Sequence, residues 1–267
     1  MNRIDKKFLA LKKAKKKAFV VFLTAGDPSL AKTEALIPAL ERAGVDLVEI
    51  GVPFSDPLAD GPVIQASSQR ALSRGVTLEK ILAMTQRVRR KTALPLLFMS
   101  YLNPIEHYGI ARFAKKAKAA GLDGVIIPDL PPDEGRIIAA TFRAQGLDLV
   151  YLLAPTSAAK RQKFISNASR GFVYFVSMTG VTGVKRALSP VVLKQVSVLR
   201  KSTRRPVCVG FGVSTPEQAK EAARAGDGVI VGSALVKALA ANPSVSPEAF
   251  VKRHILPLAR ALGKAGR

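Results

Sequence analysis

The sequence predicts an α/β fold in a single domain. Segments with the apolar spacing of helices alternate with short apolar runs along most of the chain, the pattern of parallel strands joined by helices. A phrase of glycine, aspartate and an apolar run recurs, as in Gly44-Val45-Asp46-Leu47-Val48. The chain has 267 residues, an ordinary size for one α/β barrel, and no Pro- or Gly-rich linker divides it. Together these observations predict a (β/α)8 TIM barrel with extra helices over residues 1–267.

Eight apolar runs are the candidate strands. Their near-continuous apolar character is typical of parallel strands that are covered on both faces. A doubly wound sheet is the alternative, but it usually holds roughly five to seven strands, so eight favour a closed barrel. The runs are Phe19–Thr24, Leu47–Gly51, Leu94–Met99, Gly124–Ile127, Leu149–Leu153, Phe172–Val176, Val207–Gly210 and Val229–Val231.

Helical segments separate these runs, and several have a recognisable start. Ser29 and Asp133 are predicted N-caps, because their side-chain oxygens can accept from the free N–H groups of a first turn. Thr215 precedes Pro216, which suits the first turn of a helix. Glycine follows many of the segments, where it can adopt a left-handed backbone. Clear examples are Ser29–Ala43, Glu134–Gln145 and Pro216–Ala225.

The start of the chain superficially resembles a signal peptide. Lys12–Lys17 precedes an apolar run, but that run is short, and Gly26-Asp27-Pro28 follows it instead of a small-residue cleavage site. We therefore expect the first barrel strand there. No apolar run reaches the roughly 20 residues needed to span a bilayer, so no membrane partner is expected. The single cysteine, Cys208, excludes an internal disulfide, and a cytoplasmic protein is the simplest inference.

The formal net charge of +23 is the most unusual global feature. Basic clusters are scattered over segments that we expect to be outward-facing helices and their ends. Such a surface would attract polyanions, or it is simply a solvated exterior. Aromatic interleaving and nucleic-acid-binding motifs are absent from the sequence, so we expect no specific nucleic acid.

Glu49 lies alone within the apolar run Leu47–Val52. An ionised carboxylate is costly inside such a run unless it is paired or used. Burial would raise its pKa toward the range of a general acid/base near neutral pH. A proline-rich loop carries Asp56 and Asp60 just beyond. Two carboxylates in different environments suggest proton transfer by separately tuned groups.

Glycines follow the sixth, seventh and eighth strand candidates. In a barrel, the segments leaving the last strands commonly hold a phosphate, because their backbone N–H groups can approach an anion closely. Each pair alone could be a tight turn, but three at neighbouring strand ends favour a phosphate site. None fits a dinucleotide fingerprint or a P-loop. The segments are Thr179–Gly183, Gly210–Ser214 and Gly232–Ala234.

These pieces, in this order, resemble the tryptophan synthase α subunit family over nearly the whole chain. The most specific match is Pro53-Phe54-Ser55-Asp56-Pro57-Leu58-Ala59-Asp60-Gly61-Pro62. The resemblance implies retro-aldol cleavage of indole-3-glycerol phosphate to indole and glyceraldehyde 3-phosphate, with neither metal nor cofactor on this chain. The other matching segments are Phe22–Pro28, Tyr101–Pro104, Pro128–Pro131, Gly180–Gly183, Gly210–Gly212 and Gly232-Ser233.

The resemblance also implies a role for individual residues. Glu49 corresponds to the acid/base, Asp60 to the carboxylate that stabilises charge on the indole nitrogen, and Thr182 to a hydroxyl that helps to hold that aspartate. The aromatics would line the apolar pocket, although without the resemblance they would read as barrel core. Those expected to bind the substrate's indole are Phe22, Tyr101, Tyr174 and Phe211, and those expected to hold its phosphate are Gly183, Gly212, Gly232 and Ser233.

The loop Pro53–Pro62 is longer and more apolar than a barrel needs. We expect Pro53, Phe54, Pro57 and Leu58 to be exposed there and, with Asp56, to dock a partner. The resemblance implies that this partner is a β subunit carrying pyridoxal phosphate, in an αββα heterotetramer.

Two other functions are open on the sequence alone. One is a stand-alone lyase that releases indole freely, and the other is a basic barrel that binds RNA. Cys208 reads as a small core residue. His107 and His254 cannot form a metal site by themselves, and no cluster of ligands joins them, so none is expected.

Overall fold

The computed structural model describes residues 1–176, 189–210 and 212–264. Within them, every strand pairing is parallel, and the order in the sheet is β5-β4-β3-β2-β1-β9-β8-β7-β6. The strands are β1 (Ala18–Thr24), β2 (Leu47–Gly51), β3 (Leu96–Met99), β4 (Gly124–Ile126), β5 (Asp148–Val150), β6 (Leu152–Leu153), β7 (Val173–Val176), β8 (Val207–Gly210) and β9 (Gly228–Val231).

The sheet closes on itself. Its two end strands, β5 and β6, are parts of one extended stretch that only Tyr151 interrupts, and they pair with β4 and β7 respectively. Counting this stretch once gives eight strands in a ring, which confirms the predicted barrel. The predicted run Leu149–Leu153 is therefore one barrel strand that appears as two short ladders.

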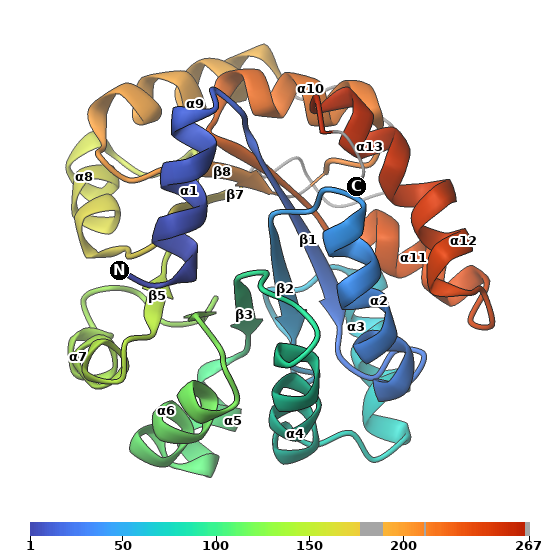
Figure 1. Ribbon diagram of the computed structural model, residues 1–267. Helices are drawn as coiled ribbons and strands as arrows, with labels where there is room; N and C mark the ends of the chain where they lie inside the picture. The colour runs from blue at the N-terminus through green and yellow to red at the C-terminus, as the bar shows by residue number, and fades with distance from the viewer. Residues whose placement is uncertain (177–188, 211, 265–267) are drawn as a thin grey trace.

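Helices surround the barrel (Figure 1). They are α1 (Arg3–Lys13), α2 (Leu30–Arg42), α3 (Pro62–Ser73), α4 (Leu78–Arg89), α5 (Leu102–Tyr108), α6 (Ile110–Ala119), α7 (Arg136–Ala144), α8 (Ala159–Ala168), α9 (Pro190–Ser202), α10 (Pro216–Ala225), α11 (Ser233–Ala241), α12 (Pro247–Phe250) and α13 (Leu256–Ala261), with a π-helical turn at Val251–Ile255. None of these helices, over the residues the structure describes, is long and apolar enough to cross a bilayer.

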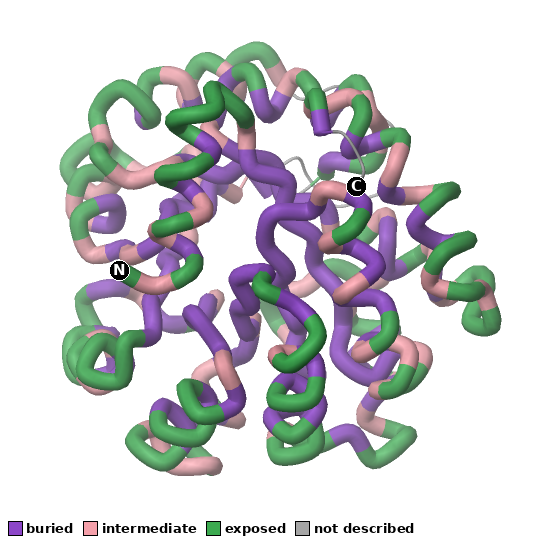
Figure 2. Tube along the Cα trace, viewed as in Figure 1, coloured by how far each residue is buried: buried purple, intermediate pink, exposed green. Residues whose placement is uncertain are grey.

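The core has two parts because side chains alternate across each strand. The larger part lies between the strands and the outer helices and includes Val21, Ile50 and Phe98. The smaller part fills the barrel interior and contains, from alternate positions, Val20, Leu47, Leu97, Ile126, Val150, Tyr174, Cys208 and Ile230. Figure 2 shows the consequence, with buried strands at the centre and exposed outer faces on the helices.

Helix α1 closes the barrel at the amino ends of the strands. Its buried residues Ile4, Phe8 and Leu11 join the interior cluster, and the Phe8 ring lies 5.7 Å from that of Phe172. An Asn2 capping box starts this helix. Because this end is plugged by apolar side chains, only the carboxyl ends of the strands are open to a ligand.

The recurring aspartates lie at the plugged end, where they tie neighbouring strands together. Asp46 accepts from the backbone N–H of Phe19 (2.9 Å), and Asp227 from that of Val207 (3.1 Å). Asp123 accepts from Leu96 (3.0 Å) and from two arginines. The sequence repeat is therefore a structural device and not part of a catalytic site.

The starts of α2 and α10 agree with the sequence prediction, and the start of α7 does not. Ser29 caps α2 as predicted, since its side chain accepts from the Lys32 backbone N–H. Pro216 begins α10 as predicted, and Thr215 caps that helix by accepting from the Gln218 backbone N–H. The predicted cap at Asp133 is wrong: α7 begins after Gly135, and Asp133 pairs with Arg161 at 2.5 Å. The attraction of that guanidinium competes with capping.

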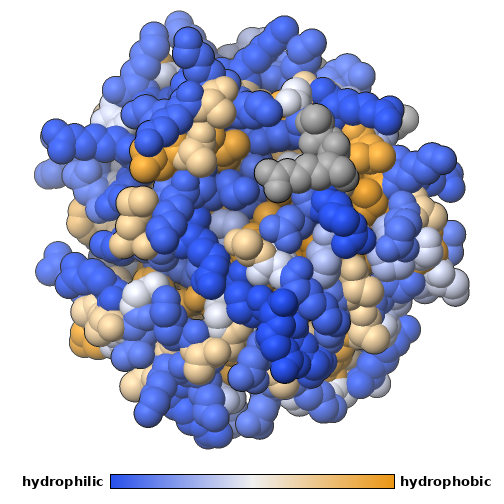
Figure 3. All heavy atoms as spheres, viewed as in Figure 1, coloured by the Kyte–Doolittle hydropathy of each residue, from blue (hydrophilic) through white to orange (hydrophobic). Residues whose placement is uncertain are grey.

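Two basic residues lie in the last turn of each of α1, α4, α6 and α9. Cations are favourable there because the free carbonyl groups of a helix end are partially negative. Hydrophilic side chains consequently dominate the face of the molecule in Figure 3, with only scattered apolar patches.

Candidate active site

Glu49 lies in the middle of β2 with its side chain inside the barrel. Its strand neighbours are Phe22 on β1 and Leu97 on β3. The residue is completely buried, and within the described residues neither carboxylate oxygen has a hydrogen-bond partner. Removal from water raises the pKa of Glu49 to about 8. The side chain is therefore a neutral acid at neutral pH that can give up a proton and take one back.

Tyr174 occupies the same interior from β7. It is 4% exposed and belongs to the interior cluster. Burial first, and then the nearby charge of Glu49, raises the pKa of the Tyr174 phenol. Gly210 on the adjacent β8 must be glycine, because an added Cβ would collide with the Tyr174 ring. The phenol is thus held in the barrel interior near Glu49.

Asp60 lies in the loop between β2 and α3, and burial raises its pKa to about 6. A hydrogen bond with Tyr101 opposes that rise. The backbone N–H of Ala59 also donates to the Tyr101 hydroxyl at 2.9 Å, and the Phe54 ring lies 5.3 Å from the Tyr101 ring. Tyr101 therefore fixes the Asp60 loop against the end of β3, a role beyond the apolar lining predicted for it.

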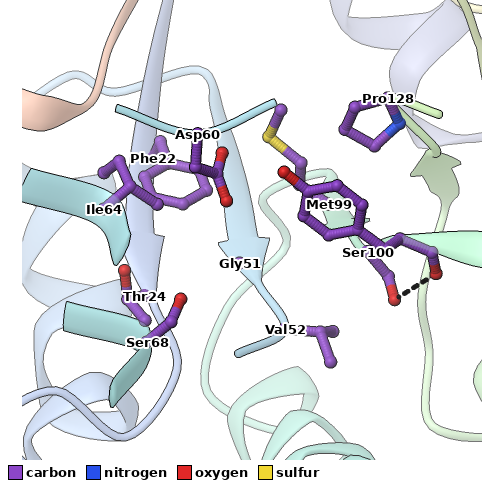
Figure 4. Close-up of a pocket in the computed structure, with 11 residues that line it drawn as sticks. Phe22, Thr24, Gly51, Val52, Asp60, Ile64, Ser68, Met99, Ser100 and Pro128 are labelled. Atoms are coloured by element: carbon purple, nitrogen blue, oxygen red, sulfur yellow. Dashed lines mark hydrogen bonds between the residues drawn. The ribbon is translucent and has the colours of Figure 1, made fainter. Parts of the chain in front are cut away.

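A pocket opens at the carboxyl ends of β1 to β4 (Figure 4). Asp60 and Phe22 face into it from one side and Met99 and Pro128 from the other. Its lining residues are Phe22, Thr24, Gly51, Val52, Asp60, Ile64, Ser68, Met99, Ser100, Tyr101 and Pro128. Glu49 is two residues before Gly51 on the same face of β2, so it lies directly below the pocket floor.

At that floor, Gly51 leaves room for the Phe22 ring. A Cβ at this position would collide with the Phe22 ring, which lies across it. The same ring adjoins Gly232, where an added Cβ would be 3.2 Å from the Phe22 Cβ. Phe22 therefore lies between Gly51, near Glu49, and Gly232, just after the end of β9.

The predicted phosphate residues lie only partly within the described chain. Gly232 is the N-cap of α11, and Ser233 is its first residue, so free backbone N–H groups of this nine-residue helix point out beside Phe22. Gly212 has a φ of +78°, a conformation that favours glycine. Thr182, Gly183 and Phe211, also predicted to bind substrate, lie outside the described residues.

The predicted docking loop is less exposed than expected. Pro53 is buried, so the expectation of an exposed residue there is wrong, because Pro53 continues directly from the buried end of β2. Phe54 and Pro57 are half-buried, whereas Asp56 is exposed. Leu58 is 94% exposed, which is unusual for a leucine. The exposed part of the loop is therefore its tip.

The loops around the pocket make two further contacts. Asp129 accepts from the backbone N–H of Leu102, at 3.0 and 3.2 Å, and so caps α5 from the neighbouring loop. Asp27 forms two hydrogen bonds with Arg70. The described residues hold no group of three side chains that could bind a metal ion. Cys208 is buried in the barrel interior, as expected.

The family model of the tryptophan synthase alpha chain matches residues 8–260. The chain belongs to the tryptophan synthase alpha chain family. The tryptophan synthase alpha chain of Geobacter sulfurreducens is 52% identical over 237 residues, 89% of this chain and 90% of that protein.

Solved structures of the family agree over the whole barrel. Tryptophan synthase subunit alpha from Legionella pneumophila aligns with a TM-score of 0.90 at 37% identity, covering 98% of this chain and 99% of that one. A chain of the tryptophan synthase complex from Pyrococcus furiosus aligns with a TM-score of 0.82 at 33% identity, covering 92% and 99%. Membership of the tryptophan synthase alpha chain family thus rests on both sequence and fold.

Proposed function

We propose that this chain cleaves indole-3-glycerol phosphate with Glu49 as the only acid/base. The supporting observation is a neutral carboxylic acid, buried below a pocket and free of hydrogen-bond partners among the described residues. The acid first protonates the ring carbon that bears the glycerol chain. The resulting carboxylate then removes the proton of the adjacent hydroxyl as the carbon–carbon bond breaks. Both bonding electrons return to the indole ring, so proton and electron counts balance without a cofactor on this chain.

Asp60 supplies the second requirement of this reaction. Protonating the ring carbon leaves positive charge on the indole nitrogen, and a fixed carboxylate that faces the pocket would stabilise it. Tyr101 would keep Asp60 at that place through the hydrogen bonds already described. Thr182 remains a predicted further support for Asp60.

The substrate's phosphate would bind at the start of α11. Backbone N–H groups and the positive end of the helix are suited to an anion there. Gly212 and Ser233 would complete this site, together with the predicted Gly183. The apolar indole would then lie between Phe22 and Tyr101, which line the pocket.

Gly232→Val should separate phosphate binding from chemistry. A side chain here would obstruct the N-terminus of α11 and remove hydrogen bonds to a charged group, each worth about 1.5–3 kcal/mol. We expect the dissociation constant of glycerol 3-phosphate to rise at least about tenfold. Ser233→Ala keeps the backbone donors and removes only a hydroxyl, so it should raise this dissociation constant less than Gly232→Val does. Unaltered glycerol 3-phosphate affinity in Gly232→Val would place the phosphate elsewhere, and unaltered indole affinity would show that the rest of the pocket is intact.

The chain pairs with a tryptophan synthase β subunit, and we propose the tip of the Pro53–Pro62 loop as the docking edge. Leu58 is almost fully exposed and lies two residues after the exposed Asp56. A partner that covered Leu58 would press on the segment that carries Asp60, and binding energy could then order the site. We also propose an αββα assembly in the cytoplasm, with pyridoxal phosphate held by the β subunit alone.

Adding a cognate β subunit should raise the rate of indole release at least about tenfold, the usual scale of coupling between sites. Leu58→Ser and Asp56→Ala should lower this activation more than they lower the basal rate. Val198→Ser is a matched control, because Val198 is 59% exposed but lies on α9. Full activity without a partner, unchanged by adding one, would favour the stand-alone lyase instead.

A further inference from the structure

Helix α3 directly follows Asp60 and is held to the barrel by little apolar surface. Its buried residues are Ser67, Ser68 and Ala71, and none is a large hydrophobic residue. The next helix, α4, buries several, including Ile81 and Met84. Since apolar burial supplies most of the energy that packs a helix, α3 needs other interactions to stay in place.

Polar interactions with β1 and the loop after it meet this need. The Thr24 and Ser67 hydroxyls are buried and 2.7 Å apart. Arg70 donates from Nε to Asp27 Oδ1 at 2.9 Å and from Nη2 to Oδ2 at 2.6 Å. The Asp27 side chain is only 3% exposed, so the carboxylate of this bidentate pair is shielded from water, while the Arg70 side chain is 36% exposed.

The Asp27 side of this pair is itself rigid. The β1–α2 loop is bonded to the end of β2 through Ala25 N–H and Gly51 O at 2.9 Å. Gly26 has a φ of +83° and packs so closely on Val76 that a side chain would collide with it. Arg70 therefore attaches α3 to a fixed point of the barrel.

The N-terminal end of α3 is attached to Asp60. Gln65 donates from Nε2 to the Asp60 carbonyl oxygen at 2.8 Å, and Gly61 is the N-cap of the helix. Thr24, which contacts Ser67 of α3, and Ser68 of α3 line the same pocket as Asp60 (Figure 4). A shift of α3 would thus move one wall of the pocket together with its carboxylate.

We propose that Arg70 and Asp27 are positioning residues that hold α3, and through it Asp60, at the distance the reaction needs. This inference rests on the role proposed for Asp60 above. Arg70 lies about nine residues along the helix from Gly61, roughly 13 Å at 1.5 Å per residue. At that distance from Gly61, and with its charge paired by Asp27, Arg70 acts weakly on Asp60 through electrostatics, so we expect its effect to be mechanical.

Arg70→Gln tests this proposal, and Arg170→Gln is its matched control. Arg170 pairs with Asp148 at the plugged end of the barrel, and both arginine–aspartate pairs have similar exposure, 42% and 3% against 36% and 3%. Each variant removes the arginine partner of a buried aspartate, and Asp148 keeps a hydrogen bond from Asn2 Nδ2 (2.7 Å), so Arg170→Gln should lose no more stability than Arg70→Gln. A displacement near 1 Å can cost up to about 10²-fold in rate, so we expect Arg70→Gln to lower kcat about tenfold or more. Its KM should change less than about threefold.

Hydrogen exchange supplies a second measurement that does not depend on activity. Arg70→Gln should speed amide exchange across residues 53–73, and Arg170→Gln should leave that segment unchanged. If Arg70→Gln fails to fold, Arg70→Lys keeps the charge but loses the two-pronged contact, and it should show the same effects in smaller measure. Equal kcat and equal exchange in the Arg70 and Arg170 variants would overturn the proposal.

Asp60→Asn, measured beside them, separates this inference from the proposed function. Full activity in Asp60→Asn would refute the role of Asp60 itself, whatever the exchange data say. Low activity in Asp60→Asn with no effect of Arg70→Gln would refute only the positioning role.

Discussion

Glu49→Gln is expected to lower kcat for indole release by about 10³–10⁴-fold, the upper part of the range for loss of a general acid/base. Glutamine has the size of glutamate but no proton to transfer, and here one group serves both proton transfers. Binding of glycerol 3-phosphate should be retained, because the start of α11 lies on another strand end. A variant that keeps more than about a tenth of wild-type turnover would contradict the assignment of Glu49 as the acid/base.

The same variant should be more stable than the wild type at alkaline pH. The pKa of Glu49 is raised from 4.5 to about 8 in the folded chain, so the neutral acid is the favoured folded form. The contribution of Glu49 to stability is full below pH 4.5 and is lost as pH rises through 8. A shift of this size corresponds to at most about 5 kcal/mol. Loss of activity with a raised melting temperature at pH 9 would show that inactivity is not unfolding.

The pH profile follows from the same value. The first proposed step needs the protonated acid, so kcat/KM should decline above about pH 8 as Glu49 ionises. Burial of Glu49 thus lowers the stability of the fold at alkaline pH but gives the group a pKa useful for catalysis, and such a trade-off between stability and activity is common. The cost of burying Glu49 explains why the sequence pattern around it is informative.

Much of the barrel could be predicted because parallel strands are buried on both faces and read as continuous apolar runs. β2 and β8 have the predicted bounds, Leu47–Gly51 and Val207–Gly210. The misplaced start of α7 has a physical cause: Asp133 has both a capping side chain and an arginine partner, and sequence cannot say which interaction wins. The division of the fifth strand at Tyr151 has no local signal either.

The sequence supplied candidate residues for the site but not the contacts between them. An isolated carboxylate in an apolar strand is visible in a sequence, so burial of Glu49 was predictable. Contacts across long loops are not, because Tyr101 and Ala59, or Arg70 and Asp27, are 42 and 43 residues apart. The segment Phe22–Pro28, which contains Asp27, was part of the family resemblance, but nothing in it identified Arg70 as the partner of Asp27.

Asp60→Asn is expected to lower kcat by about 10²–10³-fold, the usual cost of removing one group that stabilises charge in a transition state. Asparagine keeps the shape of the side chain but cannot balance a positive indole nitrogen. Asp129→Asn is the matched control for the isolated chain, because Asp129 is a carboxylate at a neighbouring strand end that already caps α5. It should change kcat less than about threefold.

The pH dependence adds a test that identifies the titrating group. Burial raises the pKa of Asp60 to about 6, so at saturating substrate kcat should fall as pH drops through 6 and the carboxylate becomes neutral. The phosphate of the substrate also titrates near pH 6, and the two can be distinguished by the variant. If Asp60 is responsible, the acidic decline disappears in Asp60→Asn. A decline that persists there unchanged would assign it to the phosphate and contradict the proposed electrostatic role.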